Sequence, residues 1–258
     1  MKQYKGYLVD LDGTTYKGKE RIPEAELFIC ELINRGIPFK IVTNNATKSV
    51  EEITDNLNNY YNIPVEQSHI YTSIIAMGDY LLEHHEGENI FVVGEKALID
   101  YLKKIGFTIN SDEKIDVVVQ GLDREVEYNK LTTAVRAILN GAEYLVTNTD
   151  RLIPTENGFI PSSGAITSFI EFATRTKPTV MGKPNQPIMQ GAIERLGLDH
   201  SEVLMIGDNY DTDILAGINL GIDTLLVLTG ITRREDIKHI TKQPSYIVDS
   251  LSDWMEKL

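Results

Sequence analysis

The sequence GYLVDLDGT at residues 6–14 decides the fold class. It begins with an apolar run of strand length and ends in two aspartates and a glycine that permits a tight turn. Asp10 and Asp12 are two positions apart, so in an extended chain both carboxyl groups project to the same side. Neighbouring carboxylates repel each other, and a bound metal or protonation of one acid relieves the repulsion. An isolated stretch of this kind is more often a plain strand with an Asp-Gly turn. A functional role for the two aspartates therefore needs support from other parts of the sequence.

Segments of strand length and of helix length alternate along nearly the whole chain. The predicted strands are the apolar runs at residues 6–12, 38–45, 89–94, 115–121, 142–148, 202–208 and 222–228. The predicted helices cover residues 23–36, a segment that opens at Ser49, and residues 95–106, 129–141, 185–197 and 212–221. Strands that alternate with helices of this length form βαβ units, so the sequence predicts an α/β protein with a parallel sheet.

Three of the predicted strands end in polar residues. The first ends at Asp10 and Asp12, the second at Thr43 and Asn44, and a late one at Asp208. Ligands of open α/β sheets bind beyond the carboxyl ends of the strands. An aspartate at the end of a buried strand costs free energy unless a cation balances it. The three aspartates together form an oxygen-rich set that suits Mg²⁺ rather than zinc.

Two further charged residues acquire a role only if this site exists. Asp213 follows Asp208 by five residues, where it could simply cap the next helix. Lys183 lies in the sequence Gly-Lys-Pro, and alone it would be an ordinary surface lysine. Beside several carboxylates and a phosphate group, Lys183 would supply the positive charge that such a site requires.

Composition excludes several classes of partner. The 38 acidic and 25 basic side chains give a formal net charge of −13, which argues against nucleic acid. No apolar run approaches the ~18 residues that span a bilayer, and the first residues do not resemble a signal peptide. Cys30 is the only cysteine, which excludes an internal disulfide. We therefore expect a soluble, cytoplasmic protein that binds neither nucleic acid nor membrane; its oligomeric state stays open.

The order of the motifs resembles that of the haloacid dehalogenase superfamily. Asp-x-Asp-Gly-Thr comes first, then Thr-Asn after the second strand, then Gly-Lys-Pro, and finally Gly-Asp-x-x-x-Thr-Asp. The middle of the chain resembles the large cap of the NagD-like, p-nitrophenylphosphatase-type subgroup. This resemblance implies a Rossmann-like parallel-sheet core made of residues 1–80 and 181–258, with an inserted α/β cap domain at residues 81–180.

The resemblance also implies roles for the four aspartates. Asp10 matches the nucleophile that forms an aspartyl-phosphate, and it is also a ligand of the metal. Asp12 matches the general acid/base, and its backbone carbonyl is a Mg²⁺ ligand in the family. Asp208 matches a further metal ligand, and Asp213 matches the residue that positions metal-bound water.

The remaining motif residues match groups that bind the substrate. Thr43, with the amide of Asn44, resembles the motif that holds the phosphate. Lys183 matches the lysine that neutralises the charge of the nucleophile and the phosphoryl group. The family thus implies a Mg²⁺-dependent phosphomonoester hydrolase. A cap over the site would admit small soluble metabolites and exclude macromolecules.

The cap sequence suggests a preference among these substrates. The turn-rich segment at residues 148–164 offers Asp150 and Arg151, and Arg124 lies in another predicted cap loop. A guanidinium pairs with a carboxylate through two hydrogen bonds, which favours sugar phosphates, including those of acid sugars. The same residues could equally be ordinary surface charges.

Other functions remain as alternatives. A nucleoside monophosphatase of the same mechanism would need the same motifs. A receiver-like, aspartate-phosphorylated switch also uses carboxylates, a threonine and a lysine, but such domains are much shorter. A P-loop match at residues 13–19 fails because Glu20 replaces the required serine or threonine.

Overall fold

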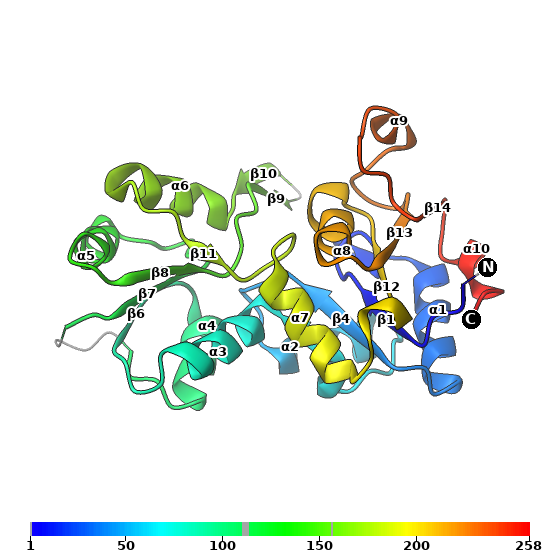
Figure 1. Cartoon of the computed structure of the whole chain (residues 1–258), viewed down its shortest axis with the longest axis horizontal. Helices are drawn as coiled ribbons and strands as arrows, with labels where there is room; N and C mark the ends of the chain where they lie inside the picture. The colour runs from blue at the N-terminus through cyan, green and yellow to red at the C-terminus, as the bar shows by residue number, and fades with distance from the viewer. Residues whose placement is uncertain (1, 110–113, 156) are drawn as a thin grey trace. The chain divides into compact units, whose positions relative to one another are not determined.

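The computed structural model describes residues 2–109, 114–155 and 157–258, and it shows two compact units (Figure 1). The first unit contains the chain up to Thr43, together with Val50–Tyr71 and Lys183–Leu258. The second unit contains Asn44–Ser49 and Thr72–Gly182.

The first unit is built on a six-stranded sheet with the order β14-β13-β12-β1-β4-β5. Its strands are β1 (Gly6–Val9), β4 (Phe39–Thr43), β5 (Ile70–Thr72), β12 (Val203–Gly207), β13 (Asp223–Val227) and β14 (Tyr246–Val248). The pairs β1–β12, β1–β4, β12–β13 and β13–β14 are parallel. The apolar strands are buried on both faces because helices cover the sheet on both sides, as is usual for parallel sheets.

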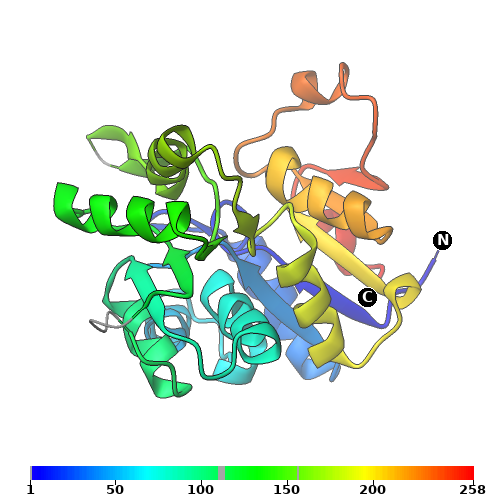
Figure 2. The same ribbon diagram turned by 60° about the vertical axis from the view of Figure 1, so that its left-hand side comes forward.

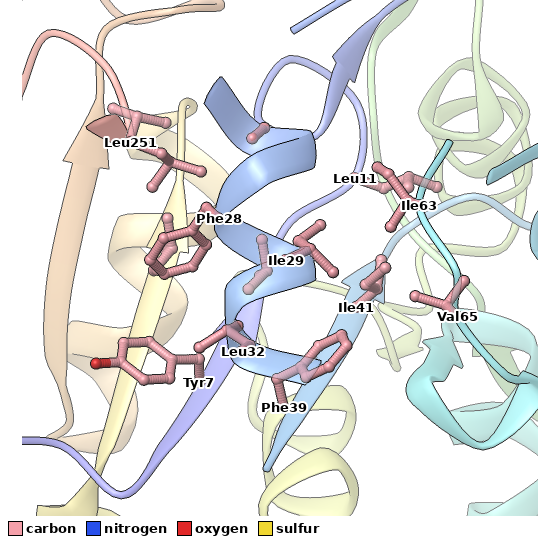
Figure 3. Close-up of a cluster of buried hydrophobic side chains, with 14 of the residues drawn as sticks. Tyr7, Leu11, Phe28, Ile29, Leu32, Phe39, Ile41, Ile63, Val65 and Leu251 are labelled. Atoms are coloured by element: carbon pink, nitrogen blue, oxygen red, sulfur yellow. The ribbon is translucent and has the colours of Figure 1, made fainter. Parts of the chain in front are cut away.

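The helices of the first unit form two layers. They are α1 (Pro23–Asn34), α2 (Val50–Tyr60), α7 (Gln186–Leu196), α8 (Leu215–Leu220), α9 (Arg234–Ile237) and α10 (Ser252–Met255). Helices α7 and α8 lie in front of the sheet in Figure 2, and α1 lies behind it. Figure 3 shows Phe28, Ile29 and Leu32 of α1 among the buried side chains of the strands. A small hairpin, β2 (Tyr16–Lys17) and β3 (Glu20–Arg21), follows β1.

The second unit has its own four-stranded sheet, with the order β11-β8-β7-β6. Its strands are β6 (Ile90–Val93), β7 (Val117–Gln120), β8 (Glu143–Val146) and β11 (Thr179–Val180), all paired in parallel. Its helices are α3 (Ser73–His84), α4 (Lys96–Lys104), α5 (Tyr128–Leu139) and α6 (Ser163–Thr174). Helices α3 and α4 cover one face and α5 and α6 the other (Figure 1). An antiparallel hairpin joins β9 (Leu152–Thr155) to β10 (Gly158–Pro161).

The predicted α/β class with a parallel sheet is confirmed, and each predicted strand is present. Strands β5 and β14 were not predicted, because three residues are too few to show a periodic pattern. Helix α6 was not predicted either, because the exposed Phe169 and Phe172 place apolar residues outside the buried face of the helix. The turn-rich segment at 148–164 contains the β9–β10 hairpin, with residue 156 outside the described part. The helix expected at 212–221 is divided into a π-helical turn, Tyr210–Ile214, and α8.

The domain ranges inferred from the resemblance stay a prediction. The second unit contains the whole of α3, which a boundary at residue 81 would divide. Within the described residues, no helix has the length and apolar character needed to cross a membrane.

Candidate active site

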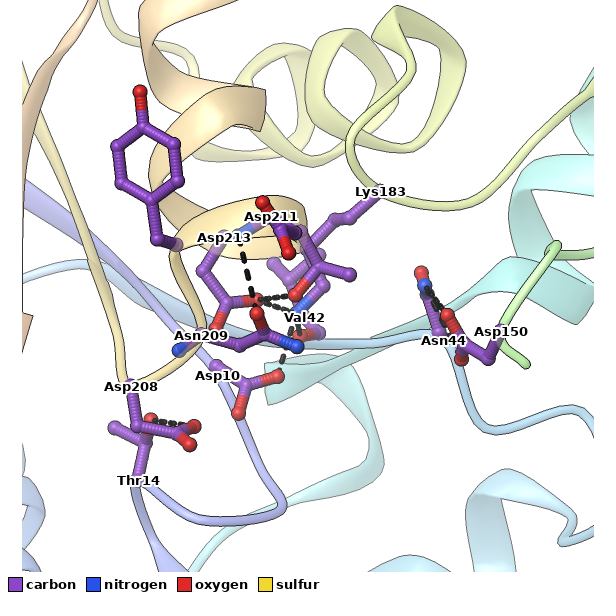
Figure 4. A network of polar contacts seen from close by, with 12 residues as sticks. Asp10, Thr14, Val42, Asn44, Asp150, Lys183, Asp208, Asn209, Asp211 and Asp213 are labelled. Carbon is purple, nitrogen blue, oxygen red and sulfur yellow. Dashed lines mark hydrogen bonds and ion pairs between the residues drawn. The ribbon is translucent and has the colours of Figure 1, made fainter. Parts of the chain in front are cut away.

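Asp10 lies directly after β1, at the carboxyl end of the six-stranded sheet. Its backbone N–H donates to Ile206 O of β12 at 2.9 Å, and its backbone carbonyl accepts a 2.7 Å hydrogen bond from Thr15 Oγ1. The buried carboxylate is 2.5 Å from Lys183 Nζ (Figure 4). The sheet and the turn that follows it therefore fix both the backbone and the side chain of Asp10.

Lys183 is buried and is not the surface lysine that its local sequence would suggest. Its ammonium group is 2.5 Å from Asp10 Oδ1, 2.8 Å from Asp213 Oδ1 and 2.8 Å from the carbonyl oxygen of Val42. Burial by itself lowers the pKa of Lys183, but the two carboxylates outweigh this effect and raise the pKa above its usual value. Lys183 thus stays charged inside the protein.

Asp208 follows β12 and is fully buried. Its carboxylate accepts hydrogen bonds from Thr14 Oγ1 at 3.1 Å and from the backbone N–H of Ile231 at 2.7 Å. A Cβ atom at Gly230 would lie 1.9 Å from Asp208 Oδ2, so only glycine lets this loop approach the carboxylate. Burial, and then the charge of Asp213, raise the pKa of Asp208 to about 6.

Asp213 lies in the π-helical turn at Tyr210–Ile214. Its carboxylate accepts from the backbone N–H of Asn209 at 3.1 Å and from Thr212 Oγ1 at 3.2 Å. A Cβ atom at Gly207 would lie 2.2 Å from Asp213 Cβ, so the glycine that ends β12 makes room for this side chain. These contacts and its proximity to Lys183 give Asp213 more than the role of a helix cap.

Asp10, Asp208 and Asp213 form a buried acidic triad, in which one carboxylate oxygen of each lies within 4.8 Å of the others. Burial, and then the charge of Asp213, raise the pKa of Asp10 well above its usual value. Lys183 balances only one of three negative charges, so the triad favours an additional cation. A donor set made only of carboxylate oxygens fits a hard ion such as Mg²⁺ and does not favour a soft metal.

The Asp12 carboxyl group lies outside this triad. Strand β1 ends at Val9 and the chain turns at Gly13, whose φ is 98°. The Gly13 N–H donates to Tyr16 O at 2.6 Å, and Asp12 is exposed whereas Asp10 is buried. The two aspartates of the motif therefore have different surroundings: Asp10 contacts Lys183 and belongs to the triad, whereas the exposed Asp12 interacts with Tyr16.

The two residues of the second motif belong to different units. Thr43 is buried at the end of β4 in the first unit. Asn44 belongs to the second unit, where its Nδ2 donates to Asp150 Oδ1 at 3.2 Å. Its backbone carbonyl accepts from Asn148 Nδ2 at 2.8 Å and from Ser73 Oγ at 2.9 Å.

The two arginines singled out in the second unit differ in their contacts. Arg124 donates two hydrogen bonds to the carboxylate of Glu95, at 2.6 and 2.7 Å, and this pairing lowers the pKa of Glu95. Arg151 is exposed on the segment that leads into β9. The guanidinium of Arg124 thus has a partner within its own unit.

Sequence reasoning missed the loop at residues 229–232, which completes the surroundings of Asp208. Thr229 Oγ1 donates to Gly13 O at 2.8 Å, and the N–H of Thr232 donates to Asp208 O at 3.1 Å. A signal was present, because this loop follows the predicted strand at 222–228 and so had to lie at the carboxyl edge of the sheet.

Comparisons with known proteins agree with these motifs. A family model described as haloacid dehalogenase-like hydrolase matches residues 7–108, and a second HAD-hydrolase-like model matches residues 180–254. An acid sugar phosphatase of Staphylococcus aureus (strain MRSA252) is 44% identical, over 100% of this chain and 99% of its own. The 5'-nucleotidase YutF of Bacillus subtilis (strain 168) is 42% identical over 99% of each chain.

Solved structures give the same result. A double mutant of the thermostable NPPase from Geobacillus stearothermophilus has a TM-score of 0.92 and 45% identity, covering 98% of this chain and 99% of its own. The p-nitrophenyl phosphatase from Archaeoglobus fulgidus has a TM-score of 0.94 and 34% identity, with full coverage of both chains. The expected Rossmann-like core with an α/β cap is confirmed at the level of fold class. The chain belongs to the haloacid dehalogenase-like hydrolases, in their NagD-like, p-nitrophenylphosphatase-type subgroup.

Proposed function

We propose that this phosphoric monoester hydrolase cleaves phosphate esters of small soluble metabolites through an aspartyl-phosphate on Asp10, with Mg²⁺ as cofactor. The observation that carries the proposal is the buried Asp10 carboxylate, 2.5 Å from the buried Lys183 ammonium and within the acidic triad. Phosphate-monoester hydrolysis requires an anionic nucleophile to approach an anionic phosphoryl group, so charge neutralisation is the main catalytic requirement.

The side chains of Asp10 and Asp208 and the backbone carbonyl of Asp12 would hold the metal, with Asp213 beside them. A bound Mg²⁺ supplies positive charge, which favours ionised Asp10 and offsets the charge of the phosphoryl oxygens. Lys183 supplies the second positive charge, and its contact with Val42 O keeps it at the end of the sheet. Thr43 and the amide of Asn44 would donate hydrogen bonds to the phosphate.

The reaction then divides into two displacements at phosphorus. In the first, an Asp10 oxygen forms a bond to phosphorus, the ester P–O bond breaks, and the Asp12 carboxyl gives its proton to the leaving alkoxide. In the second, water attacks phosphorus while ionised Asp12 accepts its proton. The bond to Asp10 breaks and inorganic phosphate leaves. The exposure of Asp12 supports this role, since the acid must reach both a leaving group and a water molecule.

Covalent labelling tests the proposed nucleophile. Rapid acid quenching during turnover of a ³²P-labelled phosphate ester should trap label on the protein. Hydroxylamine should then release the label, because hydroxylamine cleaves acyl phosphates. Asp10→Asn should take up no label, whereas Asp55→Asn, which changes an exposed aspartate of α2, should label normally. Label on Asp10→Asn would contradict the proposal.

The proposed substrates are small sugar phosphates, including those of acid sugars. The proposed location of the protein is the cytoplasm. The acid sugar phosphatase of Staphylococcus aureus supports this class. The 5'-nucleotidase of Bacillus subtilis, at similar identity, supports the nucleoside monophosphatase alternative. Because Arg124 is paired with Glu95, Arg151 is the better candidate to bind a substrate carboxylate.

A comparison of substrates separates these possibilities. The ratio of kcat/KM for an acid-sugar phosphate to that for its neutral analogue should fall about tenfold in Arg151→Ala, the cost of one charge-assisted hydrogen bond. Arg124→Ala is the matched control and should leave the ratio unchanged. An unchanged ratio in both variants, with faster turnover of nucleoside monophosphates, would favour the alternative.

A further inference from the structure

A pocket of about 340 Å³ lies in the first unit, at the amino ends of β4 and β5. It is therefore at the edge of the sheet opposite to Asp10 and Asp208, which follow the carboxyl ends of β1 and β12. Its polar lining residues are Lys40, Ser68, His69 and Arg195. Its apolar lining includes Leu32, Ile33, Ile37, Phe39 and Leu196.

Lys40 is an unusual residue for its position. It lies in β4, where it pairs with Leu8 of β1 inside a parallel sheet, and strands of such sheets are normally apolar. Its neighbours Phe39 and Ile41 belong to the core that packs on α1, so Lys40 projects from the other face. The side chain is half-buried, and its ammonium donates to Ser68 O at 2.6 Å. Among the described residues, no carboxylate forms an ion pair with Lys40.

A second cation lies in the same pocket. Arg195, in the last turn of α7, stacks its guanidinium 4.7 Å from the centre of the Tyr71 ring, and its Nη1 donates to Gly191 O at 3.3 Å. Burial, and then the charge of Arg195, lower the pKa of Lys40. Lys40 is half-buried beside a second cation and has no ion-paired carboxylate among the described residues, so an anion bound beside it would offset the cost of burying its charge.

His69 adds a third polar group. Its ring stacks on Phe39, with 4.6 Å between centres, and its Nδ1 accepts a 3.0 Å hydrogen bond from the backbone N–H of Glu66. A neutral ring that accepts at Nδ1 carries its hydrogen on Nε2, so His69 offers this pocket a donor. Glu66 is the carboxylate whose charge acts on His69, and it also accepts from Ser68 Oγ at 3.3 Å.

We propose that this pocket binds a small organic oxyanion with an apolar body, whose charged group lies between Lys40 and Arg195. A carboxylate or a phosphoryl group fits these cations, and the side chains of α1 and Phe39 would contact the apolar body. A volume near the lower end of the range for ligand pockets, ~300 to 1,000 Å³, favours a small metabolite. A pair of cations in a protein of net charge −13 is not explained by an excess of basic residues. The site is separate from the acidic triad and does not depend on the proposed reaction.

Calorimetric titration of the full chain with three aromatic probes tests this site. Benzoate and phenylphosphonate should bind, and neutral benzyl alcohol should not, because the cations require a charged group. The tighter of the two anions identifies the preferred charged group. Lys40→Gln should weaken binding about 10- to 100-fold, the loss of one charge-assisted contact, and Lys40→Arg should restore most of the affinity. Lys103→Gln, on the surface of α4, is the control and should bind as the parent does.

Two results would overturn the proposal: neither anion binds at millimolar concentration, or Lys40→Gln binds both with the parent's affinity. The second result would also show that any observed binding takes place outside this pocket. Because Arg195 is exposed on α7, Arg195→Gln provides a second variant with little risk to folding. It should weaken the binding of the same anion.

Discussion

The two parallel sheets of this protein have the same construction but different chemistry at their strand ends. In the first unit, β1 and β12 lead into Asp10 and Asp208, which form the acidic triad with Asp213, and Lys183 pairs with Asp10 and Asp213. In the second unit, the corresponding positions are neutral, because β7 ends at Gln120 and β8 leads into Thr147.

The neutral strand end satisfies all of its own polar groups. Gln120 is fully buried, and its Oε1 accepts from Tyr144 Oη at 3.0 Å and from Thr167 Oγ1 at 2.6 Å. Its Nε2 donates to Ser163 Oγ at 2.8 Å and to Gly121 O at 2.7 Å. A buried network of this kind needs no ligand, whereas three carboxylates around one lysine do. Charge imbalance at the strand ends, and not the α/β fold, therefore marks the candidate active site.

The largest expected effect is at the charged strand end. Asp10→Asn should lower kcat for p-nitrophenyl phosphate by at least about 10⁴-fold, since the amide keeps the shape but removes the nucleophile. Steady-state kinetics and thermal unfolding together check this, and the fold should remain intact. Substantial turnover by the variant would contradict the conclusion that the charged strand end of the first sheet marks the active site.

Glycines at the two strand ends provide a matched pair. Gly230→Ala would place a Cβ 1.9 Å from the Asp208 carboxylate, and we expect ~100-fold loss of kcat/KM together with a destabilisation of about 1–3 kcal/mol. Gly121→Ala would meet Leu98 Cδ2 and Thr147 Oγ1 at 3.2 Å, where small shifts relieve the contact. It should retain most of the activity. Equal losses of kcat/KM in both variants would mean that activity does not depend on the exact position of the Asp208 carboxylate.

The neutral network should matter for stability alone. Gln120→Leu would leave Tyr144, Thr167 and Ser163 without their shared partner, at a cost of about 2–4 kcal/mol in the free energy of unfolding. Urea unfolding measures the cost, and Gln186→Leu on the surface of α7 is the control. An activity loss larger than the loss of folded protein would show that this strand end also takes part in the reaction.

The smallest effect is expected at the amino edge of the first sheet. Burial lowers the pKa of His69 below its usual 6.5, so as the pH falls the unfolded chain takes up this proton before the folded protein does. The stability that neutral His69 contributes is present above pH 6.5 and is lost as the pH falls through the folded pKa. The parent should therefore lose stability relative to His69→Gln as the pH is lowered below 6.5. If the free energy of unfolding depends on pH in the same way for both proteins, the lowered pKa of His69 is contradicted.

The sequence by itself determined the parallel sheet and the most important strand ends. Apolar runs of strand length, separated by helix-length segments, are local patterns that can be read without a structure. Asp10 and Asp208 could be identified because each directly follows such a run. The loop at 229–232 could have been found by the same rule.

Only the tertiary structure decided which of these residues meet. Lys183 is 173 positions from Asp10, and Thr14 is 194 positions from Asp208, so no local pattern reports either contact. The same holds for Asp213, which the turn after β12 brings into the acidic triad, and for Asp12, which the turn at Gly13 leaves outside it. Burial and charge pairing depend on segments distant in sequence, and these long-range contacts turn a surface-like lysine into the buried counter-charge of three aspartates.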